Sequence, residues 1–132
     1  MGIYFFLGWL NVSLFAIITS PFWIGFLNKR FIHSKSQKYQ KFIKALRQIH
    51  KPLGIILAGL AFVHGFLALG VIRPHTGLLA AITVCAVVVL GIAFYRTKKR
   101  PVFLWHRALA LAVFCLVIVH ILFPNLLYTL FR

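Results

Sequence analysis

Two stretches of the chain share one layout: HKPLGIILAGLAFVH at residues 50–64 and HRALALAVFCLVIVH at residues 106–120. Each begins and ends with histidine, and thirteen residues, most of them apolar, separate the two imidazoles. Long apolar stretches of this kind are typical of membrane helices, in which an ionisable side chain is costly and usually functional. The repeated spacing therefore predicts two membrane helices that each carry a matched pair of functional imidazoles.

The composition of the whole chain indicates an integral membrane protein. Of its 132 residues 62% are hydrophobic, and none is Asp or Glu, which no ordinary soluble domain shows. A helix needs about 20 apolar residues to cross the hydrocarbon core. Four such stretches can be drawn: residues 3–27, 53–72, 77–95 and 102–123. We predict an all-α, four-helix membrane bundle that forms a single domain over residues 1–132, with little chain left for a soluble catalytic module.

The distribution of cations predicts the orientation of the chain. Lys and Arg concentrate in the short loops on the cytoplasmic side of membrane proteins. Thirteen of the 15 Lys and Arg residues lie in residues 28–51 and 96–107, which leaves only Arg73 and Arg132 for the other side. We therefore expect a multi-pass protein of a bacterial cytoplasmic membrane, with both basic loops inside and both termini outside.

The net charge of +15 does not call for nucleic acid as a partner. Anionic lipid accounts for it, because each juxtamembrane cation gains about 1 kcal/mol near an anionic leaflet. Within the first basic segment, apolar residues recur at helical spacing between lysines, and Ser36 is a suitable N-cap. We expect a basic interfacial helix at residues 36–51 that leads into the second span.

The four histidines predict two metal centres. The second and fourth spans run in the same direction, so His50 lies at the depth of His106, and His64 at the depth of His120. Fourteen residues of helix are about 21 Å long, which places one pair in each leaflet, and two heptads keep both imidazoles on one face of a helix. Neutral imidazole is a suitable axial ligand for haem iron. We infer two haems b, held without covalent bonds because the attachment signature CxxCH is absent.

Two further groups of residues are expected at these sites. Small or apolar residues beside the histidines leave room for a porphyrin: Gly54, Leu57, Ala61, Ala110, Val113 and Val117. Cations would pair with the haem propionates, namely Arg47, Lys51, Lys99, Arg100 and Arg107 at the inner haem and Arg73, His75 and Arg132 at the outer one. Lipid anchoring explains the inner cations equally well. For any single histidine, a polar contact between helices is the alternative to a ligand role.

The stretches HKPLG and WHRAL, each followed by a second histidine, resemble the haem-binding helices of the ferric reductase transmembrane domain. That family includes NADPH oxidases and the bacterial haem subunits that serve methionine sulfoxide reductases. The resemblance covers roughly residues 47–123 and implies two stacked haems b, held by two His pairs on two helices with one helix between them. The four-helix size is also similar to small dihaem cytochromes b such as superoxide oxidases.

The resemblance implies transmembrane electron transfer, with the chain as a cytochrome or the haem subunit of an oxidoreductase. Electrons would flow from a separate cytoplasmic flavoprotein or menaquinol to an external acceptor such as a ferric chelate, oxygen or a partner reductase. The alternative activity is that of a superoxide oxidase, which passes electrons from superoxide to a quinone, with Arg73 and His75 at its outer site. A haem-free membrane anchor or transporter subunit is the third hypothesis.

Overall fold

The chain is seen in a computed structural model that describes residues 2–71 and 74–130. In these residues the structure consists of helices joined by short connections and contains no strand. Its elements are α1 (Ile3–Leu27), the π-helical turn η1 (Asn28–Ile32), α2 (Gln37–Leu69), α3 (Thr76–Thr97), α4 (Arg100–Leu122) and the short α5 (Leu126–Leu130). The four long helices have the length and hydropathy to cross a membrane. The predicted all-α architecture with four apolar helices is confirmed.

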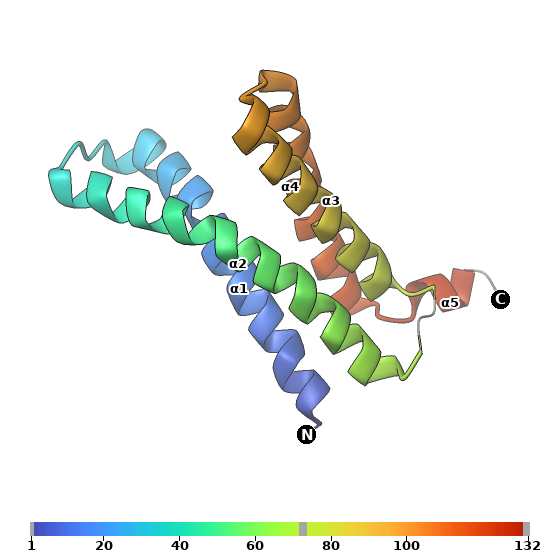
Figure 1. The fold of residues 1–132 in the computed structure, drawn as a ribbon. Coiled ribbons are helices and arrows are strands. Elements are labelled where there is room, and N and C mark those ends of the chain that lie inside the picture. The colour runs from blue at the N-terminus through green and yellow to red at the C-terminus, as the bar shows by residue number, and fades with distance from the viewer. Residues whose placement is uncertain (1, 72–73, 131–132) are drawn as a thin grey trace.

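The long helices form two antiparallel hairpins (Figure 1). Helix α1 packs along α2, and α3 packs along α4, while α2 and α3 contact one another less extensively. The hairpins diverge toward the ends at which α1 joins α2 and α3 joins α4 (Figure 1). Each hairpin is therefore packed more extensively within itself than against the other hairpin.

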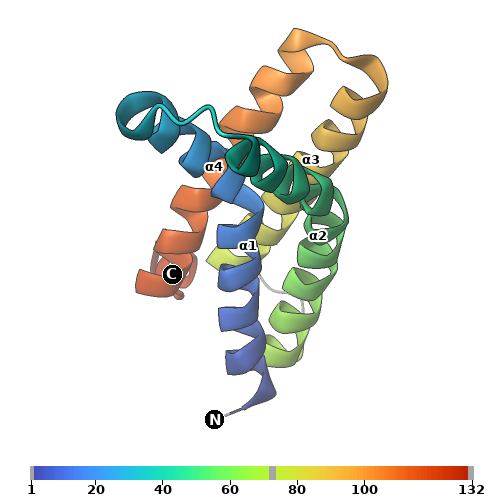
Figure 2. The same cartoon turned by 90° about the vertical axis from the view of Figure 1, so that its left-hand side faces the viewer.

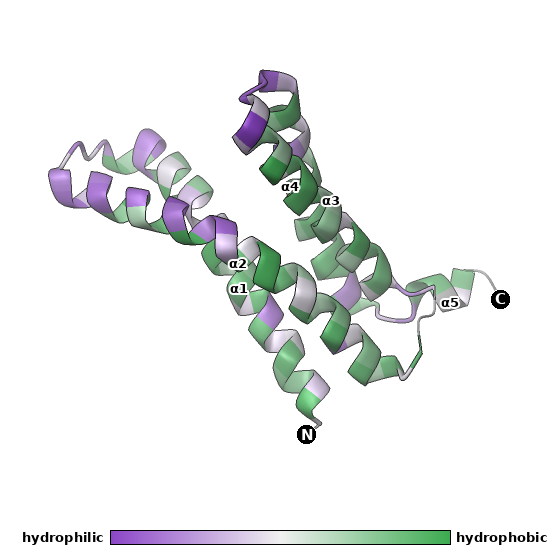
Figure 3. Cartoon of the chain, in the orientation of Figure 1, coloured by the Kyte–Doolittle hydropathy of each residue, from purple (hydrophilic) through white to green (hydrophobic). Residues whose placement is uncertain are grey.

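The basic residues gather at the tips of both hairpins. Figure 3 shows hydrophilic residues around η1 and the start of α2, and again where α3 meets α4. The start of α1 and the short helix α5 lie at the other end of the molecule (Figure 1). The gathering of basic residues at one end of the molecule agrees with the expected orientation, in which that end is cytoplasmic. The side of the membrane on which each end lies stays a prediction.

Helix α2 joins two elements that the sequence separates. The basic helix expected at 36–51 and the span expected at 53–72 form one helix, Gln37–Leu69, with Pro52 inside it. Its N-cap is Ser36, as expected, whose Oγ accepts a hydrogen bond from the Tyr39 N–H at 3.2 Å. A proline inside a helix removes one hydrogen bond and bends the axis without having to end it. Figure 2 shows the basic part of α2 running at an angle to its apolar part.

The buried core is small and takes one residue from each long helix: Ile18, Leu57, Val84 and Val113. Leu57 and Val113 lie seven residues from each histidine of their own helix. Around this core large apolar side chains face outward, for example Phe6 at 66% exposure, Phe66 at 61% and Trp105 at 64%. Such a surface is unfavourable in water and is matched by lipid, which supports the assignment to a membrane.

The orientation of the chain in the membrane can be tested by labelling with a membrane-impermeant maleimide. After Cys85 and Cys115 are replaced by alanine, we introduce either Lys35→Cys at one tip or Asn125→Cys at the opposite end. Both positions are exposed. We expect Lys35→Cys to react only in inverted vesicles and Asn125→Cys only in right-side-out vesicles, because cations are retained in the cytoplasm. The opposite labelling pattern would overturn the orientation.

Candidate functional site

The structure brings the four intramembrane histidines together in two pairs, one imidazole of each pair from each hairpin. The ring centroids of His50 and His106 are 6.1 Å apart, and the ring planes make an angle of 73°. The centroids of His64 and His120 are 6.4 Å apart at 76°. The pairing is the one that the spacing predicts, and the role of these residues as ligands stays a prediction.

Each imidazole is oriented by a hydrogen bond within its own hairpin. Three donate from Nδ1 to a main-chain carbonyl: His50 to Ile18 at 2.9 Å, His64 to Tyr4 at 2.8 Å and His106 to Val87 at 2.9 Å. A carbonyl oxygen only accepts, so Nδ1 must carry the hydrogen in all three rings. Nε2 is therefore the nitrogen that keeps a lone pair.

His120 reaches the same protonation state through a side chain. Its Nδ1 lies 3.0 Å from the Thr76 hydroxyl. That hydroxyl donates its single hydrogen to the carbonyl of Pro124, also at 3.0 Å. It must then accept from His120, so this imidazole also carries its hydrogen on Nδ1.

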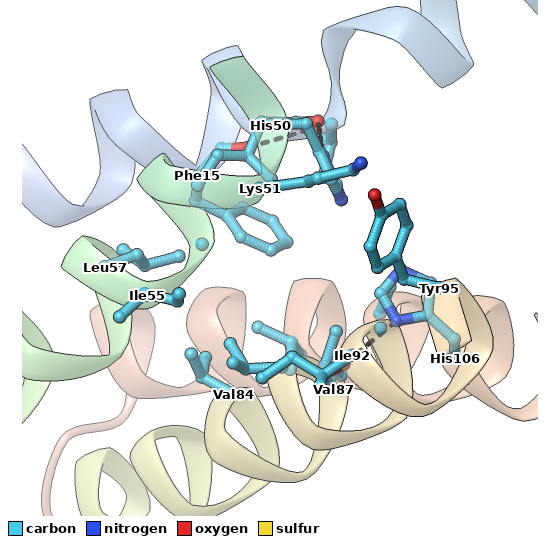
Figure 4. Close-up of a pocket in the computed structure, with 17 residues that line it drawn as sticks. Phe15, His50, Lys51, Ile55, Leu57, Val84, Val87, Ile92, Tyr95 and His106 are labelled. Carbon is cyan, nitrogen blue, oxygen red and sulfur yellow. Dashed lines mark hydrogen bonds between the residues drawn. The ribbon is translucent and has the colours of Figure 1, made fainter. Parts of the chain in front are cut away.

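The common arrangement is that of metal-binding histidines. Such residues nearly always donate the second ring N–H to a carbonyl or another acceptor, which fixes the tautomer and the orientation of the ring. Figure 4 shows His50 and His106 on facing walls of one cavity, each with its bond to the neighbouring helix. Within the described residues, the hydrogen bonds of the four rings engage only Nδ1.

Three of the imidazoles lie directly against glycines. A Cβ atom on Gly8 would lie 3.1 Å from the His64 ring, one on Gly91 would lie 3.2 Å from the His106 ring, and one on Gly77 would lie 2.9 Å from the His120 ring. The absence of a side chain at these positions is what allows the rings to approach so closely.

At two of these contacts the glycine also uncovers the carbonyl that the imidazole uses. In an α-helix the N–H of residue i bonds to the carbonyl of residue i−4. Gly8 therefore lies over the Tyr4 carbonyl, and Gly91 over the Val87 carbonyl. A larger residue at either position would shield the acceptor.

The acceptor of His50 is made accessible by a different device. Ile18 lies in the turn that precedes Pro21, which interrupts the hydrogen bonding of α1. The Ile17 carbonyl, which Pro21 leaves without its usual N–H, accepts instead from the Ser20 hydroxyl at 2.7 Å. The next carbonyl along the chain, that of Ile18, is the one that accepts from His50.

A cavity lies at each histidine pair. The inner one, at His50 and His106, has a volume of about 180 Å³, and the outer one, at His64 and His120, about 730 Å³. Both have nearly apolar walls, and Leu57 lines both of them. Sites for small molecules usually occupy about 300–1,000 Å³, so the inner cavity must widen to take a macrocycle.

Most of the predicted cofactor-binding residues line these cavities. Gly54, Lys51 and Ala110 line the inner one. Ala61, Val117 and His75 line the outer one. Lys51 holds its ammonium 3.8 Å from the centre of the Tyr95 ring, and both side chains line the inner cavity (Figure 4).

The other predicted cations are not brought to the cavities. The guanidinium of Arg107 stacks on Phe22 and Phe103, at 5.1 and 5.7 Å from the ring centres. Exposed positions are occupied by Arg47, Lys99 and Arg100. Predictions for Arg73 and Arg132 fall outside the described residues. Aromatic stacking of Arg107 gains cation–π energy near the interface, which explains its turn away from the inner pair.

His75 lies just before α3, beside the outer pair. Its Nδ1 accepts a hydrogen bond from the Gly77 N–H at 3.1 Å and so caps the helix. Its ring centroid is 5.1 Å from that of His120. Burial, and then the charge of the nearby His64, hold the pKa of His75 below its ordinary value.

The donor set fits a haem better than a bare metal ion. No group of three or more His, Cys, Asp or Glu residues gathers anywhere in the described part of the chain. Two imidazoles are too few to enclose an ion whose preferred coordination is four or more. They do match a planar macrocycle that brings four nitrogen donors of its own and needs one axial ligand on each face.

Gly8, Gly77, Gly91 and Thr76 were not singled out from the sequence. A signal exists for two of them, because the interval of fourteen residues that separates the histidines also separates Gly77 from Gly91. It also separates Tyr4 from Ile18, whose carbonyls are used. Gly8 and Thr76 have no such signal, because Phe22 and Leu90 lie fourteen residues after them.

Comparison of the chain with protein-family models, with curated proteins and with solved structures finds no match. The case for a function therefore rests on the geometry of the two pairs.

A matched pair of glycine substitutions tests the close contact at His120. Alanine is a better helix former than glycine by about 1 kcal/mol, so Gly59→Ala, where an added Cβ meets nothing within 4 Å, should raise the midpoint of thermal unfolding in detergent. Gly77→Ala should lower it, because overpacking against His120 costs about 1–3 kcal/mol. Equal stabilisation by both substitutions would contradict the contact.

Proposed function

We propose that the chain is a dihaem b-type membrane cytochrome that transfers electrons across a bacterial cytoplasmic membrane. His50 and His106 would be the axial ligands of the inner haem, and His64 and His120 those of the outer haem. Bound in this way, each haem supplies one-electron redox chemistry whose potential depends on its axial ligands and on burial.

One observation carries the proposal: the spacing of the facing rings. Two imidazoles bound at about 2 Å to opposite sides of one metal ion have ring centroids about 6 Å apart. The measured separations of 6.1 and 6.4 Å fit this requirement at both pairs.

A purely structural role for the histidines accounts for less of the geometry. One hydrogen bond from each Nδ1 is enough to join the helices of a hairpin, and nothing in that role makes the rings face one another. Two pairs of imidazoles with Nε2 free of hydrogen bonds, repeated at equal intervals, favour a shared ligand between the rings of each pair.

The residues of the chain would position the imidazoles, exclude water from the cavities and keep the two haems apart. The hydrogen bonds at Nδ1 fix the position of each ring and leave Nε2 as the nitrogen that can bind a ligand. Leu57, Val84 and Val113 form an apolar wall between the inner and outer cavities. Lys51, at the inner cavity, is placed to pair with a propionate. If two imidazoles held each haem, reaction at an open iron position would be disfavoured, and electrons would enter and leave at a haem edge.

The proposal includes separate partners on each side of the membrane. The donor would be a cytoplasmic flavoprotein or menaquinol, and the acceptor an external ferric chelate, oxygen or a partner reductase, by the likeness to ferric reductase membrane domains. The basic hairpin tips would also bind anionic lipids.

A superoxide oxidase that reduces a quinone is the second candidate. The observation that favours it is the outer cavity, which at about 730 Å³ is much larger than the inner one and is bordered by His75. Quinone-dependent consumption of superoxide by the purified protein in proteoliposomes would support this activity, and its absence at full haem loading would exclude it.

The proposed ligands can be tested by alanine substitution and absorption spectroscopy. The purified protein should show the reduced-minus-oxidised bands of haem b at two haems per chain. His64→Ala and His120→Ala should each lose the same haem, and His50→Ala and His106→Ala the other, because one iron needs both imidazoles of its pair. The exposed His33 in the basic loop is the control, and His33→Ala should keep both haems.

Colourless wild-type protein made in haem-replete cells would overturn the proposal. Full haem content in all four variants would do the same. Loss of both haems in every single variant would contradict the separation of the two sites by the apolar wall.

A further inference from the structure

We propose that the Thr76 hydroxyl sets the redox potential of the outer centre by acting through His120. This inference rests on the proposed function, because it concerns an iron bound by His64 and His120. It makes Thr76 a positioning residue, and it gives the outer centre a side-chain control that the inner centre does not have.

The burial of Thr76 is unusual among polar residues of the chain. Its side chain is 2% exposed, and in the described ranges 2–71 and 74–130 no other polar or charged residue is buried to this degree. It is the first residue of α3, where solvent would ordinarily satisfy a hydroxyl. A polar group removed from water in this way needs partners, and Thr76 has two of them.

The two partners form a directed chain from the imidazole outward. His120 Nδ1–H donates to the Thr76 oxygen, and the Thr76 hydroxyl donates to the Pro124 carbonyl, both at 3.0 Å. A hydroxyl that donates becomes a stronger acceptor, because hydrogen bonds in a chain polarise one another. The Nδ1–H of His120 therefore meets an acceptor strengthened by the loop that follows α4.

The acceptors of the other three histidines are main-chain carbonyls inside helices. These oxygens are already shared with helical N–H groups, and a side-chain substitution cannot remove them. Only at His120, among the four rings, is the acceptor itself a side-chain group that one substitution can remove.

The direction of the effect follows from the charge on iron. A hydrogen bond that draws the proton of Nδ1 away from the ring makes Nε2 a more basic ligand. The ferric ion carries one more positive charge than the ferrous ion, so the more basic ligand stabilises the ferric state more. Removing the hydroxyl weakens this preference and favours uptake of one electron from a reductant. The midpoint potential of the outer haem should therefore rise.

The start of α3 contacts the His120 ring at a second residue as well. The next residue, Gly77, lies against the same ring, where a Cβ would approach to 2.9 Å. The start of α3 thus fixes the ring sterically through one residue and electronically through the other. Substitutions at Thr76 alone separate these two effects.

The test compares Thr76→Val, which keeps the shape and loses the hydroxyl, with Thr76→Ser, which keeps the hydroxyl. Each full-length protein is purified with haem bound, and both midpoint potentials are measured by optical titration with dithionite and ferricyanide. The potential that is missing from His64→Ala identifies the outer haem. We expect Thr76→Val to raise the outer potential and leave the inner one unchanged, and Thr76→Ser to restore the wild-type value.

Thr76→Ala serves as a second hydroxyl-free variant and should shift the outer potential in the same direction as Thr76→Val. If the wild type binds two haems but neither variant shifts the outer potential, or if Thr76→Ser shifts it equally, the inference fails while the proposed function stands. Loss of the outer haem in both hydroxyl-free variants also overturns it, since Thr76 would then serve assembly alone. A wild type without haem rejects the proposed function first.

Discussion

The structure depends on one requirement, that an imidazole N–H placed in an apolar environment must find an acceptor. In each hairpin the nearest acceptors are on the neighbouring helix, so His50 and His64 are tied to α1, and His106 and His120 to α3. These bonds satisfy one nitrogen of every ring and leave the other with its lone pair available, in rings that lie close to a ring of the opposite hairpin. The same interaction therefore holds each hairpin together, selects the tautomer and prepares two facing pairs of donor atoms.

The interval of fourteen residues extends this logic over both hairpins. Two heptads return a residue to the same face of a helix in a left-handed bundle. The helix that packs against each pair of histidines must then present its contacting groups at the same interval. On α1 these groups are the carbonyls of Tyr4 and Ile18, and on α3 they are Gly77 and Gly91. Midway between the histidines, Leu57 and Val113 close the centre of the bundle. Each hairpin thus contributes one imidazole to each pair and two side chains to the core between the pairs.

The sequence predicts the parts of this arrangement that depend on composition and on spacing along one helix. The four apolar helices and the matching of His50 with His106 and of His64 with His120 are of this kind. It does not predict what depends on other segments: α2 continues through Pro52, and Arg107 stacks on an aromatic ring of α1. Main-chain acceptors have no side-chain signature, and only two of the three, the carbonyls of Tyr4 and Val87, have a glycine beside them, so the sequence could not have shown the partner of His50.

The electron paramagnetic resonance spectrum of the oxidised protein tests the central claim, that each pair of imidazoles binds one iron, most directly. Ring planes that cross at 73° and 76° make two iron d orbitals nearly equal in energy, so each pair should give a strongly anisotropic low-spin ferric signal. We expect two such signals and no high-spin signal. A high-spin signal in intact protein, which reports an iron with an open axial position, would contradict the pairing, and so would a spectrum without iron.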